Sequence, residues 1–207
     1  SQGIIAYDKY RGQSKDVIEN RIYHYDIKTK PNLGIWIKGT NIKRYNIDLD
    51  KHTYIDYSVK LANPREPKYF KGTRLLIREI TNPRIFTSVT DKELYYDPSV
   101  ITILSNKKTD IFYLLGLLNS KLLTFYHFNS SAKATKGDFP KIIIEDIKLF
   151  PLKSNNNNLK ENISKLAEEL MMSGNEKNKK DNEIDQLVYK LYELTEEEIQ
   201  IVESSVD

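Results

Sequence analysis

Few residues of this 207-residue chain have the types and spacing that catalysis or metal binding requires. The histidines, His24, His52 and His127, are scattered, and the chain contains no cysteine. Zinc sites draw on closely spaced His and Cys ligands, so the sequence argues against one. The spacing of Ser, His and Asp residues also indicates no triad for nucleophilic catalysis.

Two Asp-x-Lys triplets match half of a nuclease motif. Metal-dependent nucleases of the common restriction type place Mg²⁺ and a water with a Pro-Asp followed by an acidic-x-Lys pair. Asp26 with Lys28, and Asp146 with Lys148, supply only the second half, which is common by chance. A nuclease that uses Asp146 and Lys148 therefore stays open as an alternative.

The motifs of adenine methylation are missing as well. That reaction needs an Asn/Asp-Pro-Pro-aromatic loop for the flipped base and a Gly-rich loop for the methyl donor. Asp97-Pro98-Ser99 comes nearest but lacks the second proline. We expect that this chain alone catalyses no reaction and binds no metal or cofactor.

Basic and acidic residues are unevenly distributed along the chain. Residues 154–207 hold 6 Lys against 13 Asp or Glu, a charge of −7, and residues 1–153 hold 26 basic and 16 acidic residues, a charge of +10. A basic body suits a polyanion, because neutralised phosphates release counterions. The alternative is that Lys and Arg merely solvate the surface.

The body alternates apolar runs with turn residues, which predicts strands in LGIWIKG, KHTYIDYSV, TRLLIREIT, RIFTSVT and SVITILS. Between Asp110 and Phe128 the apolar residues recur at helical spacing, which predicts one buried helix with Asp110 as its N-cap. We therefore expect an α+β fold, a mixed and largely antiparallel β-sheet domain with a buried helix.

A helical tail is predicted after a linker at residues 154–158. Apolar stripes occur at residues 163–171 and 184–191, and Thr195 with Glu198 forms a capping box for a last short helix. We divide the chain into a body, residues 1–153, and a tail, residues 154–207. We expect the tail to pack either on the body or on a catalytic domain that lies outside this sequence.

Two features that the sequence lacks bear on where in the cell we expect the protein. No apolar run approaches the roughly 20 residues of a membrane span, and the first residues lack the order of a signal peptide. We expect a cytoplasmic protein of a bacterium or archaeon, with no membrane partner.

The order of segments in the body resembles a known family. The segments are GIIAYDKYRG, WIKGTNIKRYNID, NPREPKYFKGTRLLIREIT, YYDPSVITIL, IFYLLGLLNSKLLTFYHF and KGDFPKIIIEDIKLFPL. Together, over about residues 3–152, they resemble the TaqI-like C-terminal specificity domain of adenine-specific DNA methyltransferases and restriction-modification enzymes of the Eco57I class.

This resemblance implies a target-recognition domain, separated from its catalytic half, that binds double-stranded DNA. The parent enzyme would methylate adenine with S-adenosylmethionine, and would use Mg²⁺ if it also carries an endonuclease. The partners implied are duplex DNA and the covalently linked methyltransferase domain. The alternative is a non-catalytic protein-interaction or scaffold module in which the acidic tail is the working part.

Backbone contacts to DNA are expected from small, polar and basic residues. Hydroxyls, ammonium groups and unhindered N–H groups are common phosphate ligands. The candidates are Lys43, Tyr45, Ser130, Ser131, Lys133, Thr135, Lys136 and Gly137. The alternative for the loop at 130–137 is a solvated connector.

Base reading is expected from arginines, because a guanidinium can bind the O6 and N7 atoms of guanine together. The candidates are Arg44, Arg78 and Arg84, and strand alternation would let Arg78 share a basic face with Arg84. The alternatives are a surface ion pair of Arg44 with Asp48 or Asp50, and a cross-strand Arg-Glu pair at Arg78.

Overall fold

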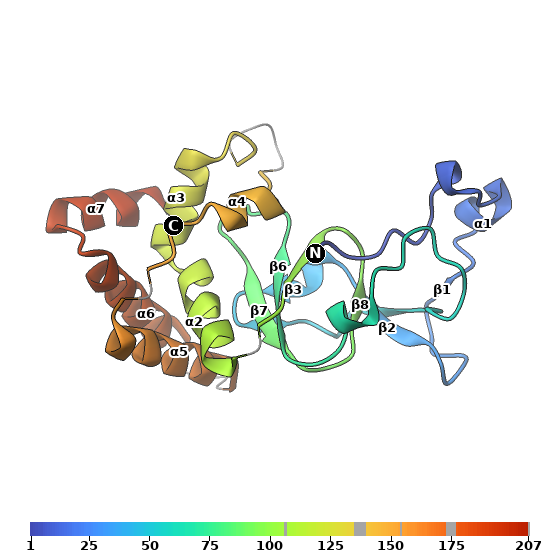
Figure 1. The fold of residues 1–207 in the computed structure, drawn as a ribbon, viewed down its shortest axis with the longest axis horizontal. Helices are drawn as coiled ribbons and strands as arrows, with labels where there is room; N and C mark the ends of the chain where they lie inside the picture. The colour runs from blue at the N-terminus through green and yellow to red at the C-terminus, as the bar shows by residue number, and fades with distance from the viewer. Residues whose placement is uncertain (106, 135–139, 154, 173–176, 207) are drawn as a thin grey trace.

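The structure is a computed structural model that describes residues 1–105, 107–134, 140–153, 155–172 and 177–206. It confirms the α+β fold. Figure 1 shows a group of helices at one end, a sheet around β6 in the middle, and a second sheet with β2 and β8 toward the other end. No helix in the described ranges is long and apolar enough to cross a membrane.

The strands are short and follow the apolar runs of the body. They are β1 (His24–Tyr25), β2 (Gly34–Ile37), β3 (Ile42–Lys43), β4 (Asn46–Ile47), β5 (Thr53–Ile55), β6 (Arg74–Arg78), β7 (Thr87–Thr90), β8 (Tyr95–Tyr96) and β9 (Val100–Ile103). The α-helices are α1 (Lys15–Glu19), α2 (Lys108–Asn119), α3 (Lys121–Ser130), α4 (Ile144–Lys148), α5 (Asn157–Met172), α6 (Lys177–Tyr192) and α7 (Glu196–Ser205). The 3-10 helices are η1 (Lys9–Arg11), η2 (Gly39–Asn41) and η3 (Pro67–Tyr69).

Strand β6 is the centre of an antiparallel sheet with the order β7-β6-β9. Its side chains alternate between two cores, as the pleat requires. Leu75 and Ile77 join the core under the helices, whereas Leu76 joins the core shared with the second sheet. Because β6 is covered on both faces, its sequence RLLIR is apolar at adjacent positions rather than at alternate ones.

The second sheet has the order β1-β5-β2-β8. Its pairs are antiparallel except for β2 with β8, which are parallel. Strands β3 and β4 form a separate two-stranded antiparallel sheet, in which Ile42 pairs with Ile47. The sheets are therefore mixed and largely antiparallel, as predicted.

The apolar run 110–128 forms two helices instead of the single helix that the sequence predicts. Ser120 has an extended backbone, and its hydroxyl accepts the N–H of Leu123 at 3.3 Å, which begins α3. The N-cap of α2 is Lys107; Asp110 lies in its first turn and pairs with Lys160 at 2.6 Å. The Asn-Ser pair at 119–120 is the polar break where the helix ends.

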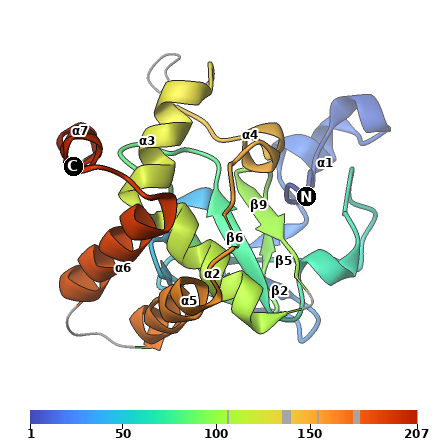
Figure 2. The same ribbon diagram turned by 60° about the vertical axis from the view of Figure 1, so that its left-hand side comes forward.

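The helical tail packs directly on the body. Helix α5 lies along α2 so closely that a β-carbon on Gly116 would stand 2.5 Å from a methyl carbon of Ile163. Residues of α2, α5 and α6 share one apolar core, and Figure 2 shows these helices lying together. Thr195 and Glu198 form the predicted capping box of α7, whereas α5 begins at Asn157, inside the predicted linker.

Candidate nucleic-acid interface

The predicted phosphate-binding loop begins at the carboxyl end of α3. Ser130 is the last residue of α3 and is exposed, and Ser131 caps the helix by donating its N–H to the carbonyl of His127 at 3.0 Å. Lys133 follows and is exposed. Thr135, Lys136 and Gly137 lie outside the described residues. The described part of the loop therefore offers two hydroxyls and one ammonium group.

The base of this loop is fixed against the continuation of β6. Lys141 donates its N–H to the carbonyl of Lys133 at 3.1 Å, and Ile142 donates to the carbonyl of Glu79 at 2.9 Å. Thr81 in turn donates its N–H to the carbonyl of Pro140 at 3.0 Å. The fold thus brings the basic loop to the same end of the molecule as Arg78, the last residue of β6.

Arg78 is half-buried, and its guanidinium carbon lies 4.9 Å from the centre of the Phe86 ring. Its neighbour Glu79 pairs with Lys141 at 3.4 Å. Among the described residues, no acidic side chain pairs with Arg78, which disfavours the cross-strand pair of the sequence analysis. Stacking uses the face of a guanidinium and leaves the N–H groups at its edge able to donate. Arg78 therefore stays a candidate for base reading.

Arg84 and Arg44 are placed differently from the prediction. Arg84 is 7% exposed and donates from Nη2 to the carbonyl of Asn119 at 2.8 Å. Arg44 donates to the same carbonyl at 2.9 Å and pairs with Asp181 of α6 at 2.6 Å. A partner in the tail, rather than Asp48 or Asp50, thus holds Arg44. Arg84 does not share a basic face with Arg78, because its guanidinium is enclosed in the interior.

The two arginines belong to a cluster that we call the polar junction. It consists of Arg44, Arg84, Asn119, Asp181 and Asp185, and it joins the body to α6. Asp185 is 1% exposed and accepts the N–H of Lys121 at 2.8 Å at the start of α3. Burial raises the pKa of Asp185 to about 6, and it lowers the pKa of Arg84, whose charge the neighbouring Arg44 disfavours further.

Asn119 is the organising residue of the polar junction. Its side chain is fully buried; the amide nitrogen donates to the carbonyl of Thr87 at 3.0 Å, and the amide oxygen accepts the N–H of Thr87 at 3.1 Å. Its own carbonyl receives Arg44 and Arg84. Sequence reasoning missed this residue, although an Asn inside an apolar run was the available signal.

Tyr45 is buried, contrary to its prediction as a phosphate contact. It is 4% exposed and belongs to the core under the helices. Its backbone has a positive φ of 57°, which is unusual for an aromatic residue, and its N–H donates to the carbonyl of Thr87 at 3.0 Å. Burial of the ring and this hydrogen bond offset the backbone cost. Tyr45 anchors the β3–β4 turn and leaves its neighbour Lys43 exposed.

The residues considered for catalysis have structural roles. Asp146 accepts the N–H of Ile143 at 2.9 Å and so caps α4, and Asp97 accepts the N–H of Ser99 at 3.0 Å in a turn. Burial lowers the pKa of His127 and lowers that of His24 to about 4. In the described ranges, no group of three His, Cys, Asp or Glu side chains is placed to hold a metal ion.

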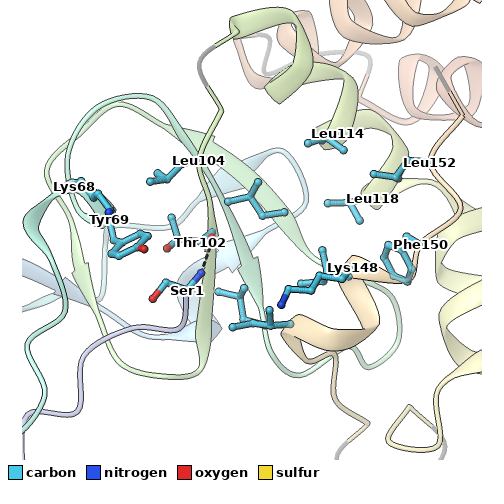
Figure 3. A pocket seen from close by; sticks show the side chains of 14 residues that line it. Ser1, Lys68, Tyr69, Thr102, Leu104, Leu114, Leu118, Lys148, Phe150 and Leu152 are labelled. Carbon is cyan, nitrogen blue, oxygen red and sulfur yellow. Dashed lines mark hydrogen bonds between the residues drawn. The ribbon is translucent and has the colours of Figure 1, made fainter. Parts of the chain in front are cut away.

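An apolar cavity of about 580 Å³ lies between β9, α2 and α4. Figure 3 shows Leu104, Leu114, Leu118, Phe150 and Leu152 around it, with Lys148 reaching in from α4. Hydrocarbon walls bind a phosphate poorly, because they cannot replace its hydration. We therefore leave this cavity outside the candidate interface, which consists of Lys43, Arg78, Ser130, Ser131 and Lys133.

Comparisons with known proteins bear on the family and the fold of this chain. The family model for the TaqI-like C-terminal specificity domain matches residues 35–152. A protein of Methanocaldococcus jannaschii, named "putative type II restriction enzyme and methyltransferase", is 33% identical over 167 residues, which cover 73% of this chain and 14% of that protein.

A solved structure, that of the type IIL restriction-modification enzyme MmeI in complex with DNA, has the same fold. Its TM-score is 0.66 at 12% sequence identity, and the match covers 99% of this chain and 34% of that chain. The chain therefore spans only a part of each of these two proteins. The family match includes β2 to α4, which carry the whole candidate interface, and on this evidence the chain belongs to the family of TaqI-like C-terminal specificity domains.

Proposed function

We propose that this chain recognises a specific sequence in double-stranded DNA, as the specificity part of a longer restriction-modification enzyme. One observation carries the proposal: the segment that matches the family model also holds the exposed Lys43 and Lys133 and the half-buried Arg78 on connected elements. The relative MmeI was solved in complex with DNA, which supports a DNA partner for this chain.

The proposed DNA contacts are of two chemical kinds, to phosphates and to a base. Lys43 and Lys133, with the hydroxyls of Ser130 and Ser131, suit phosphate oxygens, which fix the position of a protein on the duplex without reading sequence. Arg78 suits the O6 and N7 atoms of guanine in the major groove, because the stacked guanidinium has a fixed orientation. We therefore keep Arg78 as the base-reading candidate and assign Arg44 and Arg84 to the polar junction.

The catalytic steps belong to other parts of the proposed parent. We propose that its methyltransferase domain is covalently linked to this chain and modifies adenine with S-adenosylmethionine. We extend the proposal to Mg²⁺ only if the parent also cleaves DNA. We expect the parent to act in the cytoplasm, where the DNA of a bacterium or archaeon lies.

The experiment is a titration of fluorescent duplex DNA with this chain at several salt concentrations. The affinity should be weak, because a linked domain that closes on the other side of the duplex would be missing, and its logarithm should fall linearly with the logarithm of salt. An affinity that does not change with salt concentration, or no binding at any ionic strength, contradicts the proposal.

A plasmid incubated with the chain and Mg²⁺ tests the nuclease alternative. The plasmid should stay intact, because Asp146 is engaged in capping α4. Cleavage that disappears in Asp146→Asn would instead support a catalytic role. The scaffold alternative, in which the acidic tail is the working part, loses support, since the tail packs on α2 and its Asp181 and Glu203 pair with the body.

A further inference from the structure

A second cavity, of about 390 Å³, lies beside the β3–β4 hairpin and differs in character from the apolar one. Its lining is mostly polar and basic. The lining residues are Trp36, Lys38, Thr40, Asn41, Lys43, Asp48, Lys51 and Thr53. We call it the lysine pocket. Lys38 and Lys51 were not among the residues that the sequence indicated.

The lysine pocket is built around the buried side chain of Asn41. This residue is 6% exposed, and its amide oxygen accepts the N–H of Lys38 at 2.9 Å. Its amide nitrogen donates to the carbonyl of Asp48 at 2.8 Å and to that of Lys51 at 3.3 Å. One amide thus ties together the segments before η2, after β4 and before β5. The backbones that carry Lys38 and Lys51 are held on the same frame.

The charges around the lysine pocket are unbalanced. Lys38, Lys43 and Lys51 are exposed, and none of them forms an ion pair within the described ranges. Asp48 is the acidic residue of the lining, and one of its oxygens already accepts the N–H of Asp50 at 2.9 Å. Three ammonium groups against one carboxylate leave a net charge of +2. An anion is the ligand that this imbalance favours.

The remaining lining residues favour an oxyanion with several oxygens. Thr40 and Thr53 supply hydroxyls, which are frequent phosphate ligands. Trp36 is 3% exposed, and its indole N–H has no acceptor among the described residues. Ammonium groups, which act as point charges, suit phosphate, whereas a carboxylate is usually matched by the planar fork of an arginine.

The lysine pocket is joined to the candidate interface through the backbone. The turn after Lys43 is fixed by the hydrogen bond from Tyr45 to Thr87, and the preceding residue, Phe86, accepts the N–H of Arg78 at 3.0 Å. The lysine pocket and Arg78 are therefore attached to the same β6–β7 unit.

We propose that the lysine pocket binds a phosphate group of the DNA backbone, through Lys38, Lys43 and Lys51. The inference rests on the proposed function and names a contact surface that is separate from the loop at Ser130–Lys133. A free phosphate offers the same chemistry as a backbone phosphate, so the experiment must distinguish these two sources.

The test uses the full chain with Lys38, Lys43 and Lys51 all changed to Ala. A matched control changes Lys165, Lys179 and Lys190 of the tail, which are also exposed, and so removes the same charge far from the pocket in sequence. Thermal unfolding of both variants should match that of the wild type. Duplex binding of each protein is then measured across salt concentrations, and inorganic phosphate is titrated separately by NMR.

The lysine-pocket variant should bind duplex DNA more weakly, and its salt slope should be smaller than that of the wild type by about one ion per lost phosphate contact. The control should keep the wild-type slope. Equal loss in both variants, or no loss in either, overturns the inference while the salt-dependent binding of the wild type upholds the proposed function. If the lysine-pocket variant loses phosphate binding but keeps the wild-type affinity for DNA, the pocket binds a free anion. The inference is then overturned as well. Absence of DNA binding by the wild type would remove both proposals.

Discussion

The polar junction and the lysine pocket use cations in opposite ways. In the junction, Arg44 and Arg84 are largely enclosed and share a backbone carbonyl, with carboxylates of α6 nearby. In the pocket, Lys38, Lys43 and Lys51 are exposed and lack an ion pair within the described ranges. A planar guanidinium can donate to several acceptors inside a protein, whereas an ammonium group is strongly hydrated and stays in water. Arg44 and Arg84 therefore stabilise the fold, whereas Lys38, Lys43 and Lys51 remain available to a partner.

The opposite charges of body and tail are also partly used within the molecule. Asp181 and Glu203 of the tail pair with Arg44 and Lys121 of the body. Part of the excess of +10 in the body is therefore neutralised within the molecule, and only the remainder can act on DNA. A charge count from sequence overstates the positive field that a polyanion meets.

The Arg84→Ala variant should have the largest effect, and it tests whether Arg84 stabilises the interior rather than contacting DNA. This change leaves Arg44 as a positive neighbour of the buried carboxylate of Asp185 and removes one donor from the Asn119 carbonyl, so the free energy of unfolding should fall by about 3–5 kcal/mol. Urea denaturation measures this loss. A matched Arg78→Ala variant should lose far less stability, because Arg78 is only half-buried. Unchanged stability of Arg84→Ala together with weaker DNA binding would restore Arg84 as a DNA contact.

The pH dependence of stability provides a second test of the polar junction. Asp185 has a pKa of about 6 in the folded chain against an ordinary value of 3.8, so between these values the folded state binds more protons than the unfolded state. The contribution of Asp185 to stability is therefore complete below pH 4, falls as the pH rises toward 6, and is lost above it. The loss should be on the order of 1–3 kcal/mol.

Asp185→Asn removes this titration and keeps an oxygen that can accept the N–H of Lys121. The stability of the variant relative to the wild type should increase between pH 4 and pH 7, as measured by urea denaturation at each pH. A difference that stays constant over this range would show that Asp185 is ionised at all these pH values.

Arg78→Ala separates base reading from phosphate binding. If Arg78 reads a guanine, its removal should cost roughly 1–3 kcal/mol on the true site and little on other duplexes. The measurement is sequencing of methylated adenines in cells that carry the full-length enzyme with this change. Retention of the wild-type motif at full stringency would mean that the stacked Arg78 only supports the β6–β7 unit.

Lys133→Ala should have the smallest effect. Its loss should lower affinity for every duplex alike and reduce the salt slope by about one ion, because a phosphate contact carries no sequence information. Titrations of two unrelated duplexes measure both quantities. A sequence-dependent loss would place Lys133 at a base, and no loss at all would make the described part of the loop a connector.

Much of the fold could be predicted from sequence because it depends on local pattern. The run TRLLIREIT became β6, and Thr195 with Glu198 became a capping box, since both signals lie within a few residues. The break at Ser120 was missed because helical spacing of the apolar residues continues across it. Four two-residue strands, β1, β3, β4 and β8, were also missed, because such short strands depend on their partners in the sheet.

The candidate site was less predictable, because burial of a charged residue depends on distant parts of the chain. Arg84 is enclosed by Asn119, and Arg44 meets Asp181, which lies 137 residues away. A sequence window cannot reveal such a partner. Lys43 ends a short edge strand and Lys133 lies in a loop, and both are exposed, as connecting segments at the surface usually are.

Amine-reactivity footprinting with and without duplex DNA shows whether the lysines of the pocket and of the loop contact DNA. Each lysine is labelled with a small acylating reagent at low salt, and mass spectrometry gives its reactivity. We predict that DNA protects Lys38, Lys43, Lys51 and Lys133, and that the tail residues Lys165 and Lys190 react equally in both states. Protection of the tail lysines, or equal reactivity of all lysines in a sample where DNA is bound, would contradict the account.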